Sequence, residues 1–177
     1  KSDAVDAIAA IKEDGLIPAM LTGDAAGSAN AVARTVGIAE ANVHAQLLPE
    51  DKLNALKEIR KQSGAVMFVG DGINDAPVLA GADVGAAMGS GADAAIEAAD
   101  VVFMNSSVSA IPQAIKIARA TGSISMQNVI FALAIKLLVL VLGFVGFANI
   151  WAAVFADTGV AMLCILNSMR ILLKKFK

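Results

Sequence analysis

Charged side chains are almost absent from one long stretch of this chain. Between Ser123 and Met169 only Lys136 and Asp157 carry a charge, whereas the rest of the 177 residues holds the other 28 of 30 charged side chains. Cysteine is equally scarce, since a single residue, Cys164, excludes an internal disulfide and fits a reducing compartment. Fixed-period repeats and low-complexity tracts are also absent. The uneven distribution of charge divides the chain into an ordinary soluble part and an apolar part.

The apolar part contains two segments long enough to span a bilayer. Residues 129–148 read VIFALAIKLLVLVLGFVGFA, twenty residues with one charge, which as a helix are about 30 Å long. A turn near residues 146–149 leads into the second segment. Both segments lie toward the C-terminal end, which is not the position of a signal peptide. We expect residues 111–177 to form a helical extension and a transmembrane hairpin, with spans at about 123–146 and 150–172.

Residues 1–110 alternate between short apolar segments and helical segments. The strand-like segments are 16–22, 42–45, 65–71, 83–88 and 100–104, and the helical segments are 2–14, 25–36, 48–61, 75–82 and 91–99. Strands that alternate with helices over short connections favour a parallel sheet covered by helices. We therefore expect an α/β fold, a doubly wound parallel sheet with its own core, followed by the all-α hairpin. The first strand, LIPAMLT, is expected to be buried on both faces.

Two of the expected strands end in loops rich in glycine and aspartate. LIPAML runs into Thr22-Gly23-Asp24, and AVMFV runs into the loop Gly70–Asp75. Parallel strands place both loops at one edge, where ligands bind in such sheets. Asp24, Asp71, Asp75 and Asn74 offer oxygen ligands that suit Mg²⁺ beside a phosphate. Thr22, through its hydroxyl and backbone amide, and Lys52 can contact the phosphate oxygens. The alternative for any one aspartate is a helix cap, and Asp75 before Ala76-Pro77 is the clearest case.

The two charges of the apolar part lie at similar distances from the expected turn. With the turn centred on Phe147–Ala148, Lys136 precedes it by about eleven residues and Asp157 follows it by about nine, or about 17 and 14 Å. Opposite charges at one depth in antiparallel helices can pair, and charges within a membrane commonly mark an ion path. Gly159 can open the helix backbone beside the carboxylate. The alternative is a purely structural ion pair. We expect Cys164 to be a packing residue.

Three separated motifs name a family. MLTGD, LLPEDK and GDGINDAPVLAGADVGAAMGSGADAAIEAADVV closely resemble the phosphorylation domain of P-type ATPases, within the haloacid-dehalogenase-like superfamily. The resemblance continues through IPQAI and QN and so covers the chain. It implies that Thr22, Gly23 and Asp24 surround the phosphoryl group of an ATP-derived aspartyl phosphate, that Lys52 neutralises this group and that Asp71 binds Mg²⁺. It implies supporting roles for Asn74 and Asp75, the latter as a second magnesium residue.

The family's phosphorylated aspartate, in a DKTGT motif, is missing from this chain. We therefore expect the chain to be the C-terminal part of a pump and to be inactive by itself. The resemblance implies that its partners are the missing nucleotide-binding and actuator domains and earlier membrane helices, together with the lipid bilayer. No nucleic-acid partner is expected. Basic residues in RILLKKFK place the C-terminus in the cytoplasm, on the side of the soluble domain, and the expected location is the plasma (inner) membrane.

The Lys136 and Asp157-Thr158-Gly159 pair resembles the subgroup of heavy-metal pumps that exports Zn²⁺, Cd²⁺ and Pb²⁺. Counting back from Asn167 and Arg170, Asp157 stands where copper pumps have a methionine. A hard carboxylate suits a divalent ion better than Cu⁺. Asp157 is therefore the expected ligand of the transported metal, Lys136 its counter-cation and Gly159 a support. A copper pump, a membrane-tethered phosphatase and a non-catalytic regulatory fragment remain the alternatives.

Overall fold

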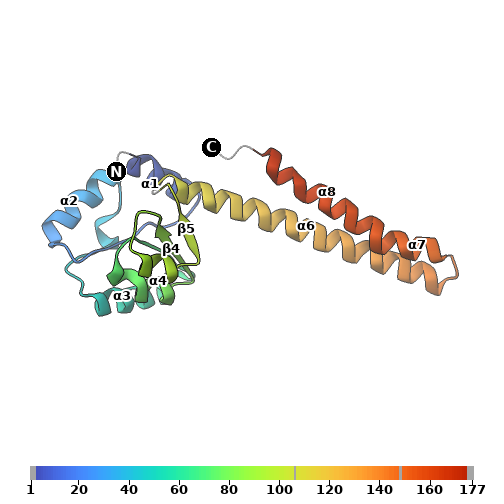
Figure 1. Ribbon diagram of the computed structural model, residues 1–177, viewed down its shortest axis with the longest axis horizontal. Coiled ribbons are helices and arrows are strands. Elements are labelled where there is room, and N and C mark those ends of the chain that lie inside the picture. The colour runs from blue at the N-terminus through green and yellow to red at the C-terminus, as the bar shows by residue number, and fades with distance from the viewer. Residues whose placement is uncertain (1–2, 106, 148, 175–177) are drawn as a thin grey trace. The chain divides into compact units, whose positions relative to one another are not determined.

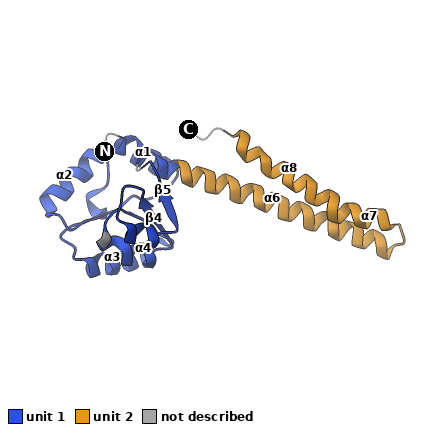
Figure 2. Cartoon of the chain, viewed as in Figure 1, with its two compact units in different colours: residues 1–112 blue, residues 113–177 orange. Residues whose placement is uncertain are grey.

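The computed structural model describes residues 3–105, 107–147 and 149–174, and of Ile73 it describes the backbone alone. The chain forms two compact units, Lys1–Pro112 and Gln113–Lys177 (Figure 2). The predicted cap Ser2, the predicted turn residue Ala148 and the terminal Lys175 and Lys177 lie outside the described residues.

Helices and strands alternate through the first unit in the predicted order (Figure 1). The helices are α1 (Ala4–Glu13), α2 (Ala26–Val36), α3 (Pro49–Ser63), α4 (Ala76–Gly81) and α5 (Asp93–Glu97), with short 3-10 turns η1 (Glu40–Asn42) and η2 (Ile73–Asp75). The strands are β1 (Met20–Leu21), β2 (Val43–His44), β3 (Met67–Gly70), β4 (Val84–Met88) and β5 (Val101–Phe103). Each of these elements overlaps the segment predicted for it.

Local sequence signals explain where two of the helices begin and end. Helix α2 ends at Gly37, whose φ of 85° is the left-handed conformation that glycine adopts without strain. Helix α3 begins with Pro49, and the carboxylate of Asp51 accepts a hydrogen bond from the amide of Leu48 at 3.1 Å. This start fixes the position of Lys52, one turn into the helix.

All described strand pairs are parallel, as predicted, and they form two groups. Strand β1 pairs with β2, whereas β3, β4 and β5 form a three-stranded sheet in that order. The prediction of a long first strand buried on both faces is wrong, because β1 covers only Met20–Leu21 and both residues are half-buried. Pro18 has no amide hydrogen and cannot extend the ladder, and Ile17 is 71% exposed.

The core of the first unit is built from small side chains around β4. Ala86, Ala87 and Met88 are buried, together with Val78 and Leu79 of α4. Gly85 allows this packing, since a Cβ atom there would lie 2.5 Å from the carbonyl oxygen of Leu79. The close approach of α4 to β4 holds in place the loop between β3 and α4, which contains Asp71 and Asp75.

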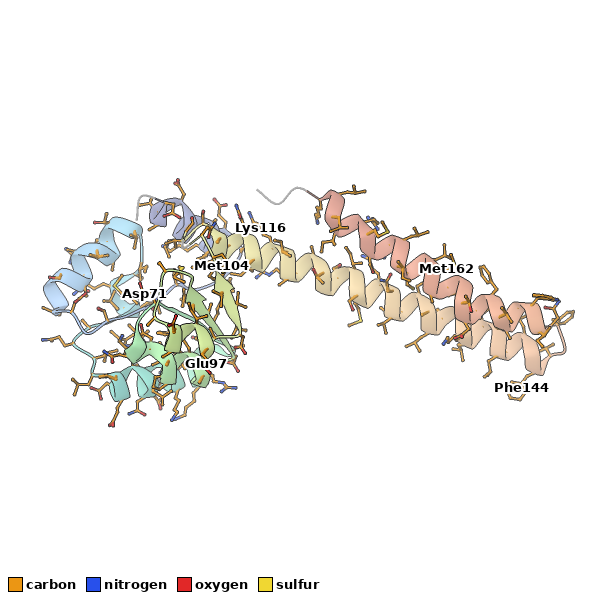
Figure 3. All side chains as sticks on the ribbon, viewed as in Figure 1. Asp71, Glu97, Met104, Lys116, Phe144 and Met162 are labelled. Atoms are coloured by element: carbon orange, nitrogen blue, oxygen red, sulfur yellow. The ribbon has the colours of Figure 1, made fainter. Side chains whose placement is uncertain are left out.

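The second unit consists of a helical hairpin. Helix α6 (Ala110–Phe144) is followed by α7 (Ile150–Val154), the π-helix η3 (Phe155–Gly159) and α8 (Val160–Leu173). The helices Ala110–Phe144 and Ile150–Leu173 are long and apolar enough to cross a membrane, and an 18-residue stretch within each has a mean hydropathy of 2.1 and 1.7, respectively. Gly146, with φ of 82°, lies in the turn between them. The side chain of Phe144, at the end of α6, extends into the surroundings (Figure 3) and is 84% exposed.

Candidate functional site

The loop after β1 is closed by its own side chains. The hydroxyl of Thr22 donates to the carboxylate of Asp24 at 3.0 Å and accepts from the amide of Asp24 at 3.1 Å. The amide of Thr22 donates to the carbonyl of His44, and the amide of Leu47 donates to the carbonyl of Thr22. The prediction that the Thr22 amide is available to a phosphate is therefore wrong in this structure, because β2 already uses it. Gly23 and Asp24 are exposed.

Lys52 reaches the second loop from the first turn of α3. Its ammonium group lies 2.7 Å from Oδ1 of Asp75, and both side chains are mostly buried, at 17% and 13% exposure. The other oxygen of Asp75 accepts a hydrogen bond from the amide of Gly72 at 3.4 Å. Only glycine fits at position 70, because a Cβ atom on this residue would lie 2.9 Å from the Cβ atom of Asp75. Asp75 thus holds Lys52 and closes its own loop, a contact that the sequence did not predict.

Asp71 and Asn74 remain exposed at the carboxyl end of β3. The carbonyl of Asp71 accepts a hydrogen bond from the amide of Ala92 at 3.0 Å, which fixes the backbone and leaves the carboxylate free to bind a ligand. Figure 3 labels Asp71 among the loops of the first unit.

The backbone from Gln46 to Lys52 links the two loops. Gln46 and Leu47 donate to the carbonyls of Asp24 and Thr22, and Lys52 binds Asp75. Within the described residues, however, no three His, Cys, Asp or Glu side chains come together closely enough to hold a metal ion. The predicted convergence of Asp24, Asp71 and Asp75 as one ligand set is therefore not formed by this part of the chain. Instead, the carboxylate of Asp75 binds the ammonium group of Lys52, and the carboxylate of Asp24 accepts a hydrogen bond from the hydroxyl of Thr22.

The two charges of the apolar unit lie against each other as predicted. The ammonium group of Lys136 on α6 is 3.1 Å from Oδ1 of Asp157 on η3. A shallow, open groove of about 480 Å³ between the helices extends from this pair past Gly143 and Ala153 to Asn149 at the turn. Within the chain both side chains are accessible, Lys136 at 56% and Asp157 at 76%, so the pair can still accept a further ligand.

The backbone that carries Asp157 is opened into a π-helix, a form that is rare and often marks a functional site. Gly159 closes this segment, and a Cβ atom there would lie 2.6 Å from the ring of Phe155. Gly159 was expected to open the backbone beside Asp157; the structure has a hydrogen-bonded π-helix there, in which the amide of Val160 donates to the carbonyl of Phe155, and the ring of Phe155 packs against Gly159.

Sequence reasoning missed a group of polar contacts farther along the hairpin. Asn128 on α6 binds Asn167, Ser168 and the backbone of Cys164 on α8. The available signal was one asparagine in each of the two spanning helices, Asn128 and Asn167.

The first unit matches a family of known proteins. Residues 1–83 match the model of the haloacid dehalogenase-like hydrolases. A parallel α/β unit with glycine- and aspartate-rich loops after its strands is the architecture that this match leads one to expect. The class defined by the fold and the site is therefore a haloacid dehalogenase-like unit joined to two membrane-type helices.

Relatives match along the whole chain. It is 47% identical over 182 residues to a cadmium, zinc and cobalt-transporting ATPase of Bacillus subtilis, covering 100% of this chain and 26% of that protein. It is 51% identical to a zinc-transporting ATPase of Synechocystis, covering 97% and 24%. The structure matches that of a zinc-transporting PIB-type ATPase in its E2.Pi state, with a TM-score of 0.91 and 40% identity, covering 97% of this chain and 28% of that one.

The chain is thus a homologue of part of the metal-transporting P-type ATPases, from its first helix to its last. It spans about a quarter of the length of the curated relatives it matches.

Proposed function

We propose that this chain is part of an ATP-driven pump that exports Zn²⁺, Cd²⁺ or Pb²⁺ through an aspartyl-phosphate cycle. The ion pair between Lys136 and Asp157 in two apolar helices is the observation that carries the proposal. An ionised carboxylate at the centre of a spanning helix costs about 2.5–3.5 kcal/mol on insertion scales, and such residues commonly line ion paths. A helix that only anchors a phosphatase in the membrane does not require a charged side chain at this position.

Asp157 is proposed as a ligand of the transported ion, and Lys136 as its counter-cation. When the metal binds, the carboxylate exchanges its contact with the Lys136 ammonium for one with the metal. When the metal leaves, Lys136 again compensates the charge. A hard carboxylate favours a divalent ion over Cu⁺, for which thiolate and thioether ligands are preferred. The relatives named for zinc and cadmium support this choice over a copper pump.

The donors of the first unit fit a magnesium ion. Mg²⁺ is commonly bound by one or two carboxylates together with water and phosphate oxygens, and Asp71 offers a free carboxylate at the carboxyl end of β3. We propose Asp71 as the protein ligand. When bound, Mg²⁺ would neutralise negative charge on the phosphoryl group. Asp75 was also predicted to bind Mg²⁺, but its oxygens are engaged by Lys52 and Gly72, and we assign it to orienting Lys52.

Lys52 and the loop Thr22–Asp24 are proposed to receive the phosphoryl group. An ammonium group has three donors, and Asp75 occupies one of those of Lys52. The remaining donors can bind phosphate oxygens. Asp24 has only acceptor oxygens and holds the hydroxyl of Thr22, which must turn away from Asp24 before it can donate to a phosphate oxygen. Gly23 leaves the backbone accessible, and Asn74 is exposed beside Asp71.

The proposed partners are the remaining parts of the same pump: a nucleotide-binding domain, an actuator domain and earlier transmembrane helices. The proposed setting is the plasma (inner) membrane, with the first unit and the C-terminus in the cytoplasm. Arg170 and Lys174 at the end of α8 support this orientation through the preference of basic residues for the cytoplasmic side.

Transport by the full-length protein tests the proposal. Inside-out vesicles that contain it should accumulate Zn²⁺ when ATP and Mg²⁺ are supplied, and Asp157→Ala should abolish accumulation while the protein still inserts. Asp6→Ala removes an exposed carboxylate of α1 and is the matched control. ATP hydrolysis that does not respond to Zn²⁺, Cd²⁺ or Pb²⁺ would favour the tethered phosphatase, and a response to Cu⁺ alone would favour the copper pump.

A further inference from the structure

Polar side chains form a directed chain of hydrogen bonds between α6 and α8. The guanidinium of Arg170 donates to Oδ1 of Asn167 at 2.9 Å, and Nδ2 of Asn167 donates to Oδ1 of Asn128 at 2.8 Å. Nδ2 of Asn128 then donates to the hydroxyl of Ser168 at 2.8 Å. We call Asn128, Asn167, Ser168 and Arg170 the polar clamp.

Every member of the polar clamp fits one orientation only. Nδ2 of Asn128 also donates to the carbonyl of Cys164 at 3.1 Å, and the hydroxyl of Ser168 donates to the same carbonyl at 2.9 Å. If the side-chain amide of Asn128 were flipped, its NH₂ group would face the NH₂ group of Asn167, and neither could accept a hydrogen bond. Between helices in an apolar medium, few other forces select a rotation of one helix against its neighbour. The polar clamp therefore selects a single rotation of α8 relative to α6.

The π-helix η3 contains Asp157 of the ion pair and directly precedes α8, which carries Asn167, Ser168 and Arg170 of the polar clamp. A π-helix closes its hydrogen bonds one residue later than an α-helix and so absorbs an extra residue. If Phe155–Gly159 changed to α-helix, α8 would turn by about 100° relative to α7. Asn167 and Ser168 would then leave Asn128, because they lie beyond η3 in the chain. The polar clamp in this arrangement therefore requires the π form of η3.

The other end of the segment is held independently. The side chain of Asn149 accepts a hydrogen bond from the amide of Ala152 at 3.0 Å and caps α7 at the turn. Because α7 is held at the turn, α8 can rotate after loss of the polar clamp only if the backbone between them changes. That backbone is η3, which contains Asp157.

We propose that the polar clamp keeps η3 in its π form and thereby holds Asp157 against Lys136, so that Asn128 and Asn167 are positioning residues for the metal site. The inference rests on the proposed function of Asp157 as a metal ligand. Without the polar clamp, η3 relaxes to the more stable α-helix and Asp157 turns away from Lys136. An unusual backbone conformation persists only where its surroundings enforce it, and here the polar clamp supplies that constraint.

Substitutions in the full-length protein test this coupling. Asn128→Leu, Asn167→Leu and the double variant remove the central hydrogen bond, and Ser168→Ala is a milder change. Gln127→Leu makes the same polar-to-apolar change at the neighbouring exposed position and serves as the control. Cys164 is a built-in reporter, because its sulfur packs 3.7 Å from the carbonyl of Asn128. Its alkylation by a membrane-permeable maleimide can be followed by peptide-resolved mass spectrometry, beside equilibrium binding of Zn²⁺.

Each single leucine variant is expected to raise the alkylation rate of Cys164 and to weaken Zn²⁺ binding by a factor of roughly 3 to 20, the range that one interhelical hydrogen bond supports. The double variant should resemble Asn128→Leu, which already loses the hydrogen bonds to Asn167, Ser168 and Cys164. Ser168→Ala should shift both readouts less, and Gln127→Leu neither.

Unchanged alkylation and unchanged Zn²⁺ binding in Asn128→Leu would overturn the inference. Faster alkylation with unchanged Zn²⁺ binding would overturn the positioning of the metal site. Asp157→Ala, measured in parallel, then separates the two causes of such a result. If Asp157→Ala also binds Zn²⁺ normally, the proposed ligand is wrong, and if it does not, only the polar clamp's role is wrong.

Discussion

Two aspartates that follow β3 differ in what surrounds them. Asp71 is exposed and its backbone carbonyl accepts a hydrogen bond from the amide of Ala92, whereas the carboxylate of Asp75 is held by Lys52 and Gly72. A carboxylate that already has a cation at 2.7 Å must give up that contact before it can bind another cation. The two residues therefore have different roles: the carboxylate of Asp71 is available to a metal ion, whereas that of Asp75 holds Lys52.

Asp71→Asn should lower formation of the phosphorylated intermediate in the full-length protein by about a hundredfold, the loss typical when one electrostatic contact to the reacting group is removed. Acid-stable, hydroxylamine-sensitive labelling from radioactive ATP measures this. Asp6→Asn, an exposed carboxylate on α1, should label like the wild type. Wild-type labelling of Asp71→Asn would mean that the magnesium ion is bound elsewhere.

Asp3 is expected to make the stability of the first unit depend on pH. Hydrogen bonds from the Ser107 hydroxyl and the Ser109 amide lower the pKa of Asp3 from 3.8 to about 2. Because the folded-state pKa is the lower one, these bonds stabilise the fold above pH 3.8, and the stabilisation disappears as the pH falls from 3.8 to about 2.

Asp3→Asn should accordingly reduce the urea midpoint at about pH 6 and have little effect at about pH 2. Circular dichroism of the detergent-solubilised chain can follow this, with Asp6→Asn as the control from the same helix. If Asp3→Asn lowered the urea midpoint equally at both pH values, the ionised carboxylate of Asp3 would not be the source of the pH-dependent stability.

Among the elements, η3 is the one whose backbone carries the proposed metal ligand. Its geometry depends on Gly159, since the ring of Phe155 occupies the space that a Cβ atom would take. A side chain at this position must displace the ring or close the π-helix.

Gly159→Ala should weaken Zn²⁺ binding roughly tenfold, because overpacking forces the backbone of η3 to move. Adding Phe155→Ala should restore much of the affinity by making room for the new methyl group. Gly122→Ala in α6 has no neighbour within 4 Å and should bind normally. Equal affinities for Gly159→Ala and Gly122→Ala would show that the ring contact is irrelevant to the site.

The elements were predictable because each has a local signal. Gly37 ends α2, Pro49 starts α3, and unbroken apolar runs define the spanning helices. The π-helix was not predictable in form, because no local pattern in Phe155–Gly159 distinguishes π from α hydrogen bonding, and its geometry depends on the packing of Phe155 against Gly159 and on the contact of Asp157 with Lys136 of α6. The length of β1 also escaped prediction, since it depends on pairing with β2 rather than on its apolar sequence.

Among the contacts of the candidate sites, the sequence predicted those that follow from the positions of residues along two antiparallel helices. The pairing of Lys136 with Asp157 was predicted from their similar distances to a turn, and it is present. The contact of Lys52 with Asp75 crosses 23 residues and depends on how α3 packs, which no local pattern encodes. The same holds for Asn128 and Asn167, which are separated by 39 residues.

At the scale of the whole molecule, the chain joins a haloacid dehalogenase-like unit to a hairpin of membrane type, and α6 begins in one unit and ends in the other. No DKTGT motif occurs in these 177 residues. The purified chain should therefore neither hydrolyse ATP nor form an acyl phosphate. Hydroxylamine-sensitive labelling of the purified chain would contradict this and would place a nucleophile among its own aspartates.

Bound Zn²⁺ and turnover in Asp157→Ala, Lys136→Ala and the double variant of the full-length protein decide whether this pair is a metal site. Asp157→Ala should lose bound Zn²⁺ and Zn²⁺-stimulated ATPase activity without loss of insertion, because removing a charge from a spanning helix eases insertion. Lys136→Ala should still bind Zn²⁺ but turn over slowly, since the carboxylate lacks its counter-cation after release. The double variant should resemble Asp157→Ala. A purely structural pair requires the reverse, two single variants that are equally destabilised and a double variant that transports, and a transporting double variant would contradict the assignment of Asp157.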